Sequence, residues 1–138
     1  MATVTLLEYK DAPPEVRAVY DDICRTRKTD DVNQFWKALA HQPENLKRVW
    51  EQMKQVMGAG SLDPLTKELI YLAVSVTNGC TYCIHSHTAA ARAKGLTDAQ
   101  YQEFVGVVGL AQQTNAIVTA LQVPTDPRFL AGGTPANR

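Results

Sequence analysis

The sequence lacks an excess of charge, a long apolar run and a leader-like beginning, and each absence excludes a class of protein. Its 14 basic residues balance 14 acidic ones, so the clustered positive charge that binds nucleic acid or an anionic membrane is missing. The longest apolar candidate, 69–76, is much shorter than the ~18 residues that a membrane span needs. Residues 1–10 hold no cationic segment followed by an apolar run, as a secretory signal would. We therefore expect a cytoplasmic protein that binds neither nucleic acid nor membrane.

Cysteine is scarce, with three in the whole chain. Two of them, Cys80 and Cys83, lie only three positions apart. In a cytoplasmic chain, this pattern favours redox or metal chemistry over a structural disulfide framework. The third, Cys24, borders an apolar helix face, and we expect it to pack there as a small hydrophobic residue.

Strand signals are missing as well, because no alternating apolar pattern with a hairpin turn occurs. Apolar residues instead recur at helical spacing, and Pro, Asp, Thr, Asn and Gly residues mark the segment ends. These segments are, in chain order, 14–23, 32–40, 43–57, 64–77, 80–94 and 101–121. The short run 105–108 is ambiguous between helix and strand. The pattern predicts an all-α fold of about six helices in a single domain, 1–138, with a loosely ordered tail at 131–138.

The cysteine pair shares a predicted helix with a histidine. If the helix begins at Cys80, then Cys83 at i+3 and His87 at i+7 lie on the same face. The free backbone N–H groups at a helix start stabilise a thiolate, and one thiol of such a pair commonly has a lowered pKa. His87, one turn after Cys83, can remove a thiol proton directly or through one water.

Glu68 is the candidate carboxylate that holds the imidazole of His87 in the right tautomer. It lies on the preceding predicted helix, which the Asn78–Gly79 turn should fold back against the cysteine helix. Its neighbours in the sequence are largely apolar, so we expect a partly buried carboxyl with a raised pKa.

Each of these residues has a plain structural alternative. The cysteine pair could be fortuitous, His87 a hydrogen-bonded helix residue and Glu68 a solvated one. Haem attachment requires a histidine directly after the second cysteine, where this chain has Ile84. Structural zinc requires four ligands, and a fourth is not evident. A thioredoxin fold requires a βαβ context that is absent here. The joint spacing therefore favours dithiol chemistry without a metal or a cofactor.

The series Glu68, eleven residues, Cys80, two residues, Cys83, three residues and His87 resembles the core motif of alkylhydroperoxidase D in the carboxymuconolactone decarboxylase-like superfamily. The resemblance covers about 62–121, and Tyr82 stands where some members carry a histidine. It implies an all-helical fold and a homo-oligomer, commonly a trimer or a hexamer.

The resemblance also implies a role for each residue. Cys83 would attack a peroxide to give a sulfenic acid, Cys80 would condense with it to a disulfide, and His87 with a water would relay the proton towards Glu68. Cys80 would face an external dithiol reductant, either a lipoylated or a thioredoxin-like protein. The expected function is thus a thiol-dependent peroxidase or disulfide reductase.

Two other functions stay open. One is a non-enzymatic redox-sensing or scaffold oligomer, whose disulfide only switches assembly. The other is a carboxymuconolactone decarboxylase-type enzyme, which is disfavoured because those enzymes generally lack the cysteine pair.

Overall fold

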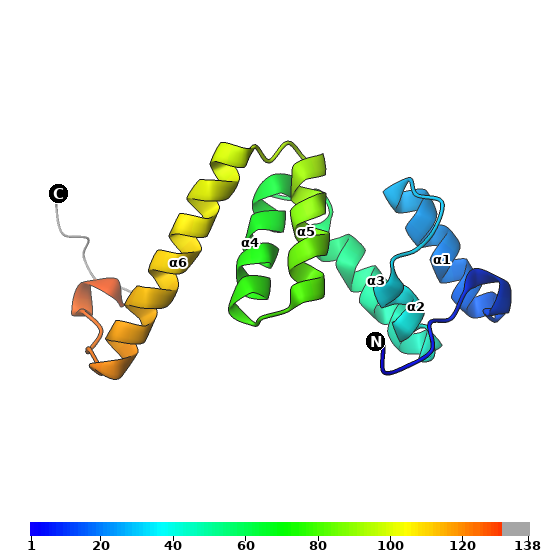
Figure 1. The fold of residues 1–138 in the computed structure, drawn as a ribbon, viewed down its shortest axis with the longest axis horizontal. Coiled ribbons are helices and arrows are strands. Elements are labelled where there is room, and N and C mark those ends of the chain that lie inside the picture. Colours follow the sequence, from blue (N-terminus) through cyan, green and yellow to red (C-terminus); the bar gives the residue numbers. More distant parts are fainter. Residues whose placement is uncertain (131–138) are drawn as a thin grey trace. The chain divides into compact units, whose positions relative to one another are not determined.

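Six α-helices and two short 3-10 helices make up residues 1–130, the part of the chain that the computed structural model describes (Figure 1). The α-helices are α1 Pro14–Arg27, α2 Gln34–Leu39, α3 Pro43–Met57, α4 Pro64–Thr77, α5 Thr81–Ala93 and α6 Asp98–Ala120. The 3-10 helices are Tyr9–Asp11 and Pro127–Phe129. These residues contain no strand, so the predicted all-α fold is confirmed, and the ambiguous run 105–108 lies inside α6. The tail predicted at 131–138 lies outside the described residues.

The helix starts follow local side-chain chemistry. Asp63 precedes α4, and its carboxylate accepts a hydrogen bond from the backbone N–H of Thr66 at 3.0 Å. Thr97 and Gln100 form a reciprocal capping box at the start of α6, with hydrogen bonds of 2.9 and 3.1 Å. Such caps satisfy backbone donors that the first helical turn leaves free. The predicted start of α4 at residue 64 is confirmed, whereas α6 begins at Asp98, three residues before the predicted segment 101–121.

The chain divides into two compact units, Met1–Ser61 and one that begins at Leu62. The first holds α1, α2 and α3 around an aromatic core, in which Trp36 and Trp50 meet edge to face with ring centroids 5.5 Å apart. Cys24 is not in a disulfide and packs against this core, as predicted. That the two units form a single domain stays a prediction.

The second unit is built on α4 and α5, which pack side by side (Figure 1). Leu72 of α4 and Ala91 of α5 are both fully buried. The reversal between the helices uses Gly79, whose φ of 65° lies in the left-handed region that glycine adopts readily. The backbone N–H of Cys80 then donates to the carbonyl of Ser75 at 3.0 Å. The predicted fold-back of the Glu68 helix onto the cysteine helix is therefore confirmed.

Candidate active site

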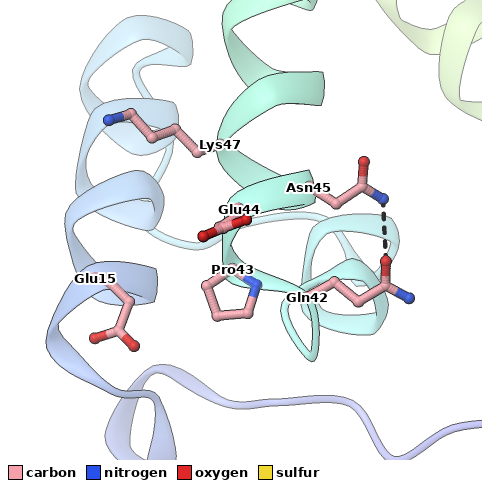
Figure 2. A pocket seen from close by; sticks show the side chains of 6 residues that line it. All are labelled: Glu15, Gln42, Pro43, Glu44, Asn45 and Lys47. Atoms are coloured by element: carbon pink, nitrogen blue, oxygen red, sulfur yellow. Dashed lines mark hydrogen bonds between the residues drawn. The ribbon is translucent and has the colours of Figure 1, made fainter.

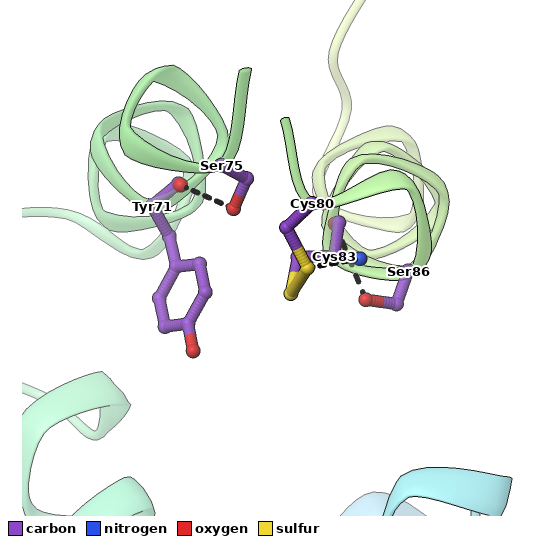
Figure 3. The surroundings of a disulfide bond; sticks show 5 residues. All are labelled: Tyr71, Ser75, Cys80, Cys83 and Ser86. Atoms are coloured by element: carbon purple, nitrogen blue, oxygen red, sulfur yellow. Dashed lines mark hydrogen bonds between the residues drawn. A yellow bond between two sulfur atoms is a disulfide. The ribbon is translucent and has the colours of Figure 1, made fainter. Parts of the chain in front are cut away.

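Cys80 and Cys83 are joined by a disulfide at the start of α5 (Figure 3). Their Cα atoms lie 5.3 Å apart. Cys80 is the N-cap residue of α5, and its sulfur accepts the backbone N–H of Cys83 at 3.3 Å. The predicted pair is thus close enough to bridge, and one sulfur lies where the helix start favours negative charge.

His87 and Glu68 are hydrogen-bonded across the two helices. The imidazole Nδ1 lies 2.7 Å from Oε2 of Glu68, whose side chain is only 7 % exposed. An ionised carboxylate can only accept, so Nδ1–H is the donor. In the neutral ring Nε2 then carries the lone pair and is free to accept a proton. The contact predicted between these two residues is present.

Lys94 joins the same carboxylate and was not predicted from the sequence. Its Nζ donates to Oε1 of Glu68 at 3.0 Å, so each carboxylate oxygen has a cationic or N–H partner. Lys94 is the C-cap residue of α5 and follows His87 by seven positions. Seven positions bring a helical residue back to the same face, and this spacing is the signal that could have identified it.

The pKa of Glu68 is the point at which the sequence prediction was wrong. Burial raises the pKa of this carboxyl, but the hydrogen bonds from His87 and Lys94, with their charges, lower it by more. The net pKa lies below the ordinary value for glutamate, not above it. The prediction failed because it included the apolar surroundings of Glu68 and left out the lysine.

Tyr71 is a second neighbour that sequence reasoning missed. Its ring stacks on the imidazole of His87, with centroids 3.7 Å apart and an angle of 22° between the planes. It lies on α4, one turn after Glu68, and Figure 3 shows it on the helix across from the disulfide. Glu68 and Tyr71 therefore contact His87 from the same face of α4.

Other candidate features of the described residues are not part of the cluster formed by Glu68, Tyr71, His87 and Lys94. His85 is exposed on α5. A cavity of about 710 Å³ belongs to the first unit and contains none of the predicted site residues (Figure 2). Its lining residues are Glu15 of α1 and, at the start of α3, Gln42, Pro43, Glu44, Asn45 and Lys47. Within residues 1–130, no group of three or more His, Cys, Asp or Glu side chains is arranged to hold a metal ion.

The bridged cysteine pair lies at the start of α5, and His87 of the same helix is hydrogen-bonded to Glu68 of α4. These features define the class as an all-helical dithiol protein. Residues 43–126 match the family model described as the carboxymuconolactone decarboxylase family. The chain belongs to this family.

Solved and curated relatives agree with this assignment. The crystal structure of an alkylhydroperoxidase AhpD core from Rhodospirillum rubrum has a TM-score of 0.91 and 60 % identity, covering 95 % of this chain and 98 % of that one. The alkyl hydroperoxide reductase AhpD of Solibacter usitatus is 33 % identical over 53 % of this chain. That of Azorhizobium caulinodans is 46 % identical over 38 % of this chain. The matches span only 40 % and 29 % of these two relatives' own lengths. The predicted resemblance to alkylhydroperoxidase D is confirmed.

Proposed function

We propose that the protein is a thiol-dependent peroxidase that reduces hydrogen peroxide or an organic hydroperoxide. The observation that carries this proposal is the cysteine pair at the start of α5, the helix that also holds His87, whose imidazole is hydrogen-bonded to Glu68 of α4. The curated relatives named alkyl hydroperoxide reductase support it at the level of the family.

In the first half-reaction, Nε2 of His87 takes the proton of the Cys83 thiol, directly or through one water. The thiolate sulfur attacks one peroxide oxygen, and the O–O bond breaks. The other oxygen leaves as water or an alcohol, taking the proton back from the imidazolium. Cys83 is oxidised to a sulfenic acid while the peroxide is reduced by two electrons.

In the second half-reaction, the Cys80 thiolate attacks the sulfur of the Cys83 sulfenic acid. A disulfide forms, the S–O bond breaks, and hydroxide leaves as water after it gains the thiol proton. The described structure has this oxidised form. An external dithiol must then reduce the disulfide, and a lipoylated or thioredoxin-like protein supplies that chemistry.

The assignment of the attacking sulfur depends on position along α5. Cys80 caps the helix, so the local N–H groups stabilise its thiolate and make it a good leaving group when a reductant attacks. Cys83 lies four positions before His87 on α5, and we assign His87 to it as the base. The two cysteines thus have different neighbours, and we assign peroxide attack to Cys83.

A stoichiometric titration tests the proposal. The reduced protein is mixed with increasing hydrogen peroxide, or with cumene hydroperoxide, and its intact mass and free thiols are followed. The proposal predicts that one equivalent of peroxide removes two thiols and two hydrogen atoms per chain, faster than it oxidises free dithiothreitol. If the protein is oxidised no faster than dithiothreitol, the peroxidase function is rejected. The redox-sensing or scaffold function would then be favoured.

We further propose that the protein is a homo-oligomer, with a trimer or a hexamer as the expected size. In the described part of the chain, no residue of α6 is buried, and Val107, Leu110 and Leu121 are 62–70 % exposed. No charged residue occurs between Glu103 and Asp126. An apolar helix without a charged face is stable when another surface covers it.

Two glycines of α6 support the same proposal. Gly106 and Gly109 lie inside the helix, where each costs about 1 kcal/mol relative to alanine. A Cβ added at either position would meet no atom of the described chain within 4 Å. Packing within the second unit therefore does not require them, whereas another surface lying close to α6 would explain them. We propose a second copy of this chain as that partner.

A further inference from the structure

Glu68 holds two hydrogen-bond partners that act on different carboxylate oxygens. His87 donates from Nδ1 to Oε2 at 2.7 Å, and Lys94 donates from Nζ to Oε1 at 3.0 Å. Both partners come from α5, while Glu68 comes from α4. The side chain of Glu68 is 7 % exposed and that of Lys94 is 37 % exposed. The side chain of Lys94 is thus the most exposed of the three, since that of His87 is 16 % exposed.

When the imidazole of His87 is neutral, as it must be to take the Cys83 proton, the charges in this cluster balance only if Lys94 is included. A buried carboxylate with a neutral imidazole as its sole partner would carry one uncompensated negative charge, which is costly in a poorly solvated site. Such a carboxyl can lower its energy by taking up a proton. A protonated carboxyl is a weaker acceptor for Nδ1–H, and it can donate its own proton to the imidazole instead. The ring could then adopt the tautomer that leaves Nε2 protonated.

We propose that Lys94 is a positioning residue, which keeps Glu68 ionised so that His87 retains its Nδ1–H tautomer and offers Nε2 to the Cys83 proton. This inference rests on the proposed peroxidase function for its chemical purpose. Lys94 itself contacts neither the sulfur atoms nor the peroxide in the proposed steps.

A purely structural role for Lys94 is the competing explanation. A lysine near a helix C-terminus stabilises the helix through the local dipole, and the backbone N–H of Lys94 donates to the carbonyls of Ala90 and Ala91. Those backbone bonds do not depend on the side chain. The two explanations differ in their pH dependence, because only the positioning role involves the protonation of Glu68.

The pH dependence follows from the groups that act on Glu68. His87 and Lys94, both from α5, are the residues whose hydrogen bonds and charges lower its pKa, against the effect of burial. Tyr71 of α4 stacks on His87, and the neighbouring cation Arg92 pairs with Asp98 of α6 at 2.7 Å. Without Lys94, burial would be less opposed and the pKa of Glu68 would rise. The active, ionised form would then be lost at a higher pH.

The test compares the wild type with Lys94→Met, Lys94→Arg and Arg92→Met. Arg92→Met is the matched control, because it removes a cation from the same end of α5 without removing a partner of Glu68. Each reduced protein is alkylated with iodoacetamide across a pH series, and modification of Cys83 is quantified by peptide mass. The carboxyl carbon of Glu68 is titrated in parallel by NMR, a measurement that needs neither peroxide nor turnover.

We expect Lys94→Met to move the acid limb of Cys83 alkylation and the Glu68 midpoint to higher pH by about half a unit to one unit. This is less than the one to three units of a fully desolvated pair, since Lys94 is partly exposed. Lys94→Arg should restore the wild-type position, and Arg92→Met should leave it unchanged.

Other outcomes would overturn the proposal. An unchanged profile in Lys94→Met, or an equal shift in Arg92→Met, would show that Lys94 has no specific effect on the relay. A second neutral variant, Lys94→Gln, is measured in case Lys94→Met fails to fold. Loss of helical circular dichroism in both variants would assign the lysine to stability alone. Failure of the peroxidase function would be distinguishable from failure of this proposal. In that case peroxide would oxidise the wild type no faster than dithiothreitol, while the titration midpoint of Glu68 would still move to higher pH in Lys94→Met.

Discussion

Tyr71 lies nearly parallel over the imidazole of His87, with 3.7 Å between the ring centroids and 22° between the ring planes. The imidazole is therefore held on one face by an aromatic ring and at Nδ1 by the carboxylate of Glu68. Two contacts from one helix limit rotation of the ring. We expect this restraint to keep Nε2 aimed along α5, where the preceding turn carries Cys83.

Removing the stacked ring should slow the reaction without abolishing it. Stacked aromatic pairs contribute about 0.5–1.5 kcal/mol beyond their buried area, so Tyr71→Ala should lower the rate of Cys83 oxidation by up to about tenfold. Tyr71→Phe keeps the ring and should react at close to the wild-type rate. Stopped-flow measurement of thiol loss after peroxide addition gives the oxidation rates of the two variants. Equal slowing in both variants would assign the effect to the hydroxyl instead.

Replacing Glu68 by glutamine tests the carboxylate's part in the relay. Glu68→Gln keeps the shape of the side chain but removes the charge that favours the Nδ1–H tautomer. We expect oxidation near neutral pH to slow by about tenfold, at the low end of the range for proton-transfer groups. Glu103→Gln, which removes an exposed carboxylate from α6, is the control. An unchanged pH–rate profile in Glu68→Gln would exclude Glu68 from the mechanism.

The lowered pKa of Glu68 also predicts a pH dependence of stability. A carboxyl with a folded-state pKa below its ordinary value of 4.5 stabilises the fold above that pH. This contribution is lost as the pH falls below 4.5 and through the folded-state pKa. The free energy of unfolding should therefore differ more between wild type and Glu68→Gln near neutral pH than in acid. Urea titrations at several pH values measure this difference, and a gap that widened in acid would contradict the sign.

The exposed face of α6 predicts a specific response to added charge. Leu110 is 62 % exposed, and a charge placed there would be buried without a partner if a second copy covers the helix. Leu110→Glu should shift the protein from an oligomer towards the 15.2 kDa single chain, while Gln112→Glu, at an exposed polar position, should change it less. Size-exclusion chromatography with light scattering measures the mass. A wild-type mass equal to that of a single chain would contradict the oligomer proposal.

Much of the fold was predictable because its signals are local. Asp63 and Thr97 cap helices through atoms three positions away, so the sequence alone contains both partners. The contact between His87 and Glu68 required one further step, which the Asn78–Gly79 turn supplied by folding α5 back on α4.

The contributions of Lys94 and Tyr71 were not predicted, because they depend on side-chain directions across two packed helices. Spacing places Lys94 on the face of His87, but only the structure shows its ammonium group reaching Glu68. The sign of the Glu68 pKa shift depends on that reach, which is why burial alone gave the wrong direction. Stacking by Tyr71 likewise follows from the closeness of α4 and α5 and not from a motif.

The most direct test of the account asks which sulfur meets the peroxide. Reduced wild type, Cys83→Ser and Cys80→Ser are mixed with hydrogen peroxide in the presence of dimedone, which labels sulfenic acids, and labelled peptides are identified by mass. We expect Cys80→Ser to accumulate label on Cys83, and Cys83→Ser to lose thiol about a hundredfold or more slowly than wild type. Oxidation of Cys83→Ser at the wild-type rate, with the label on Cys80, would contradict this expectation.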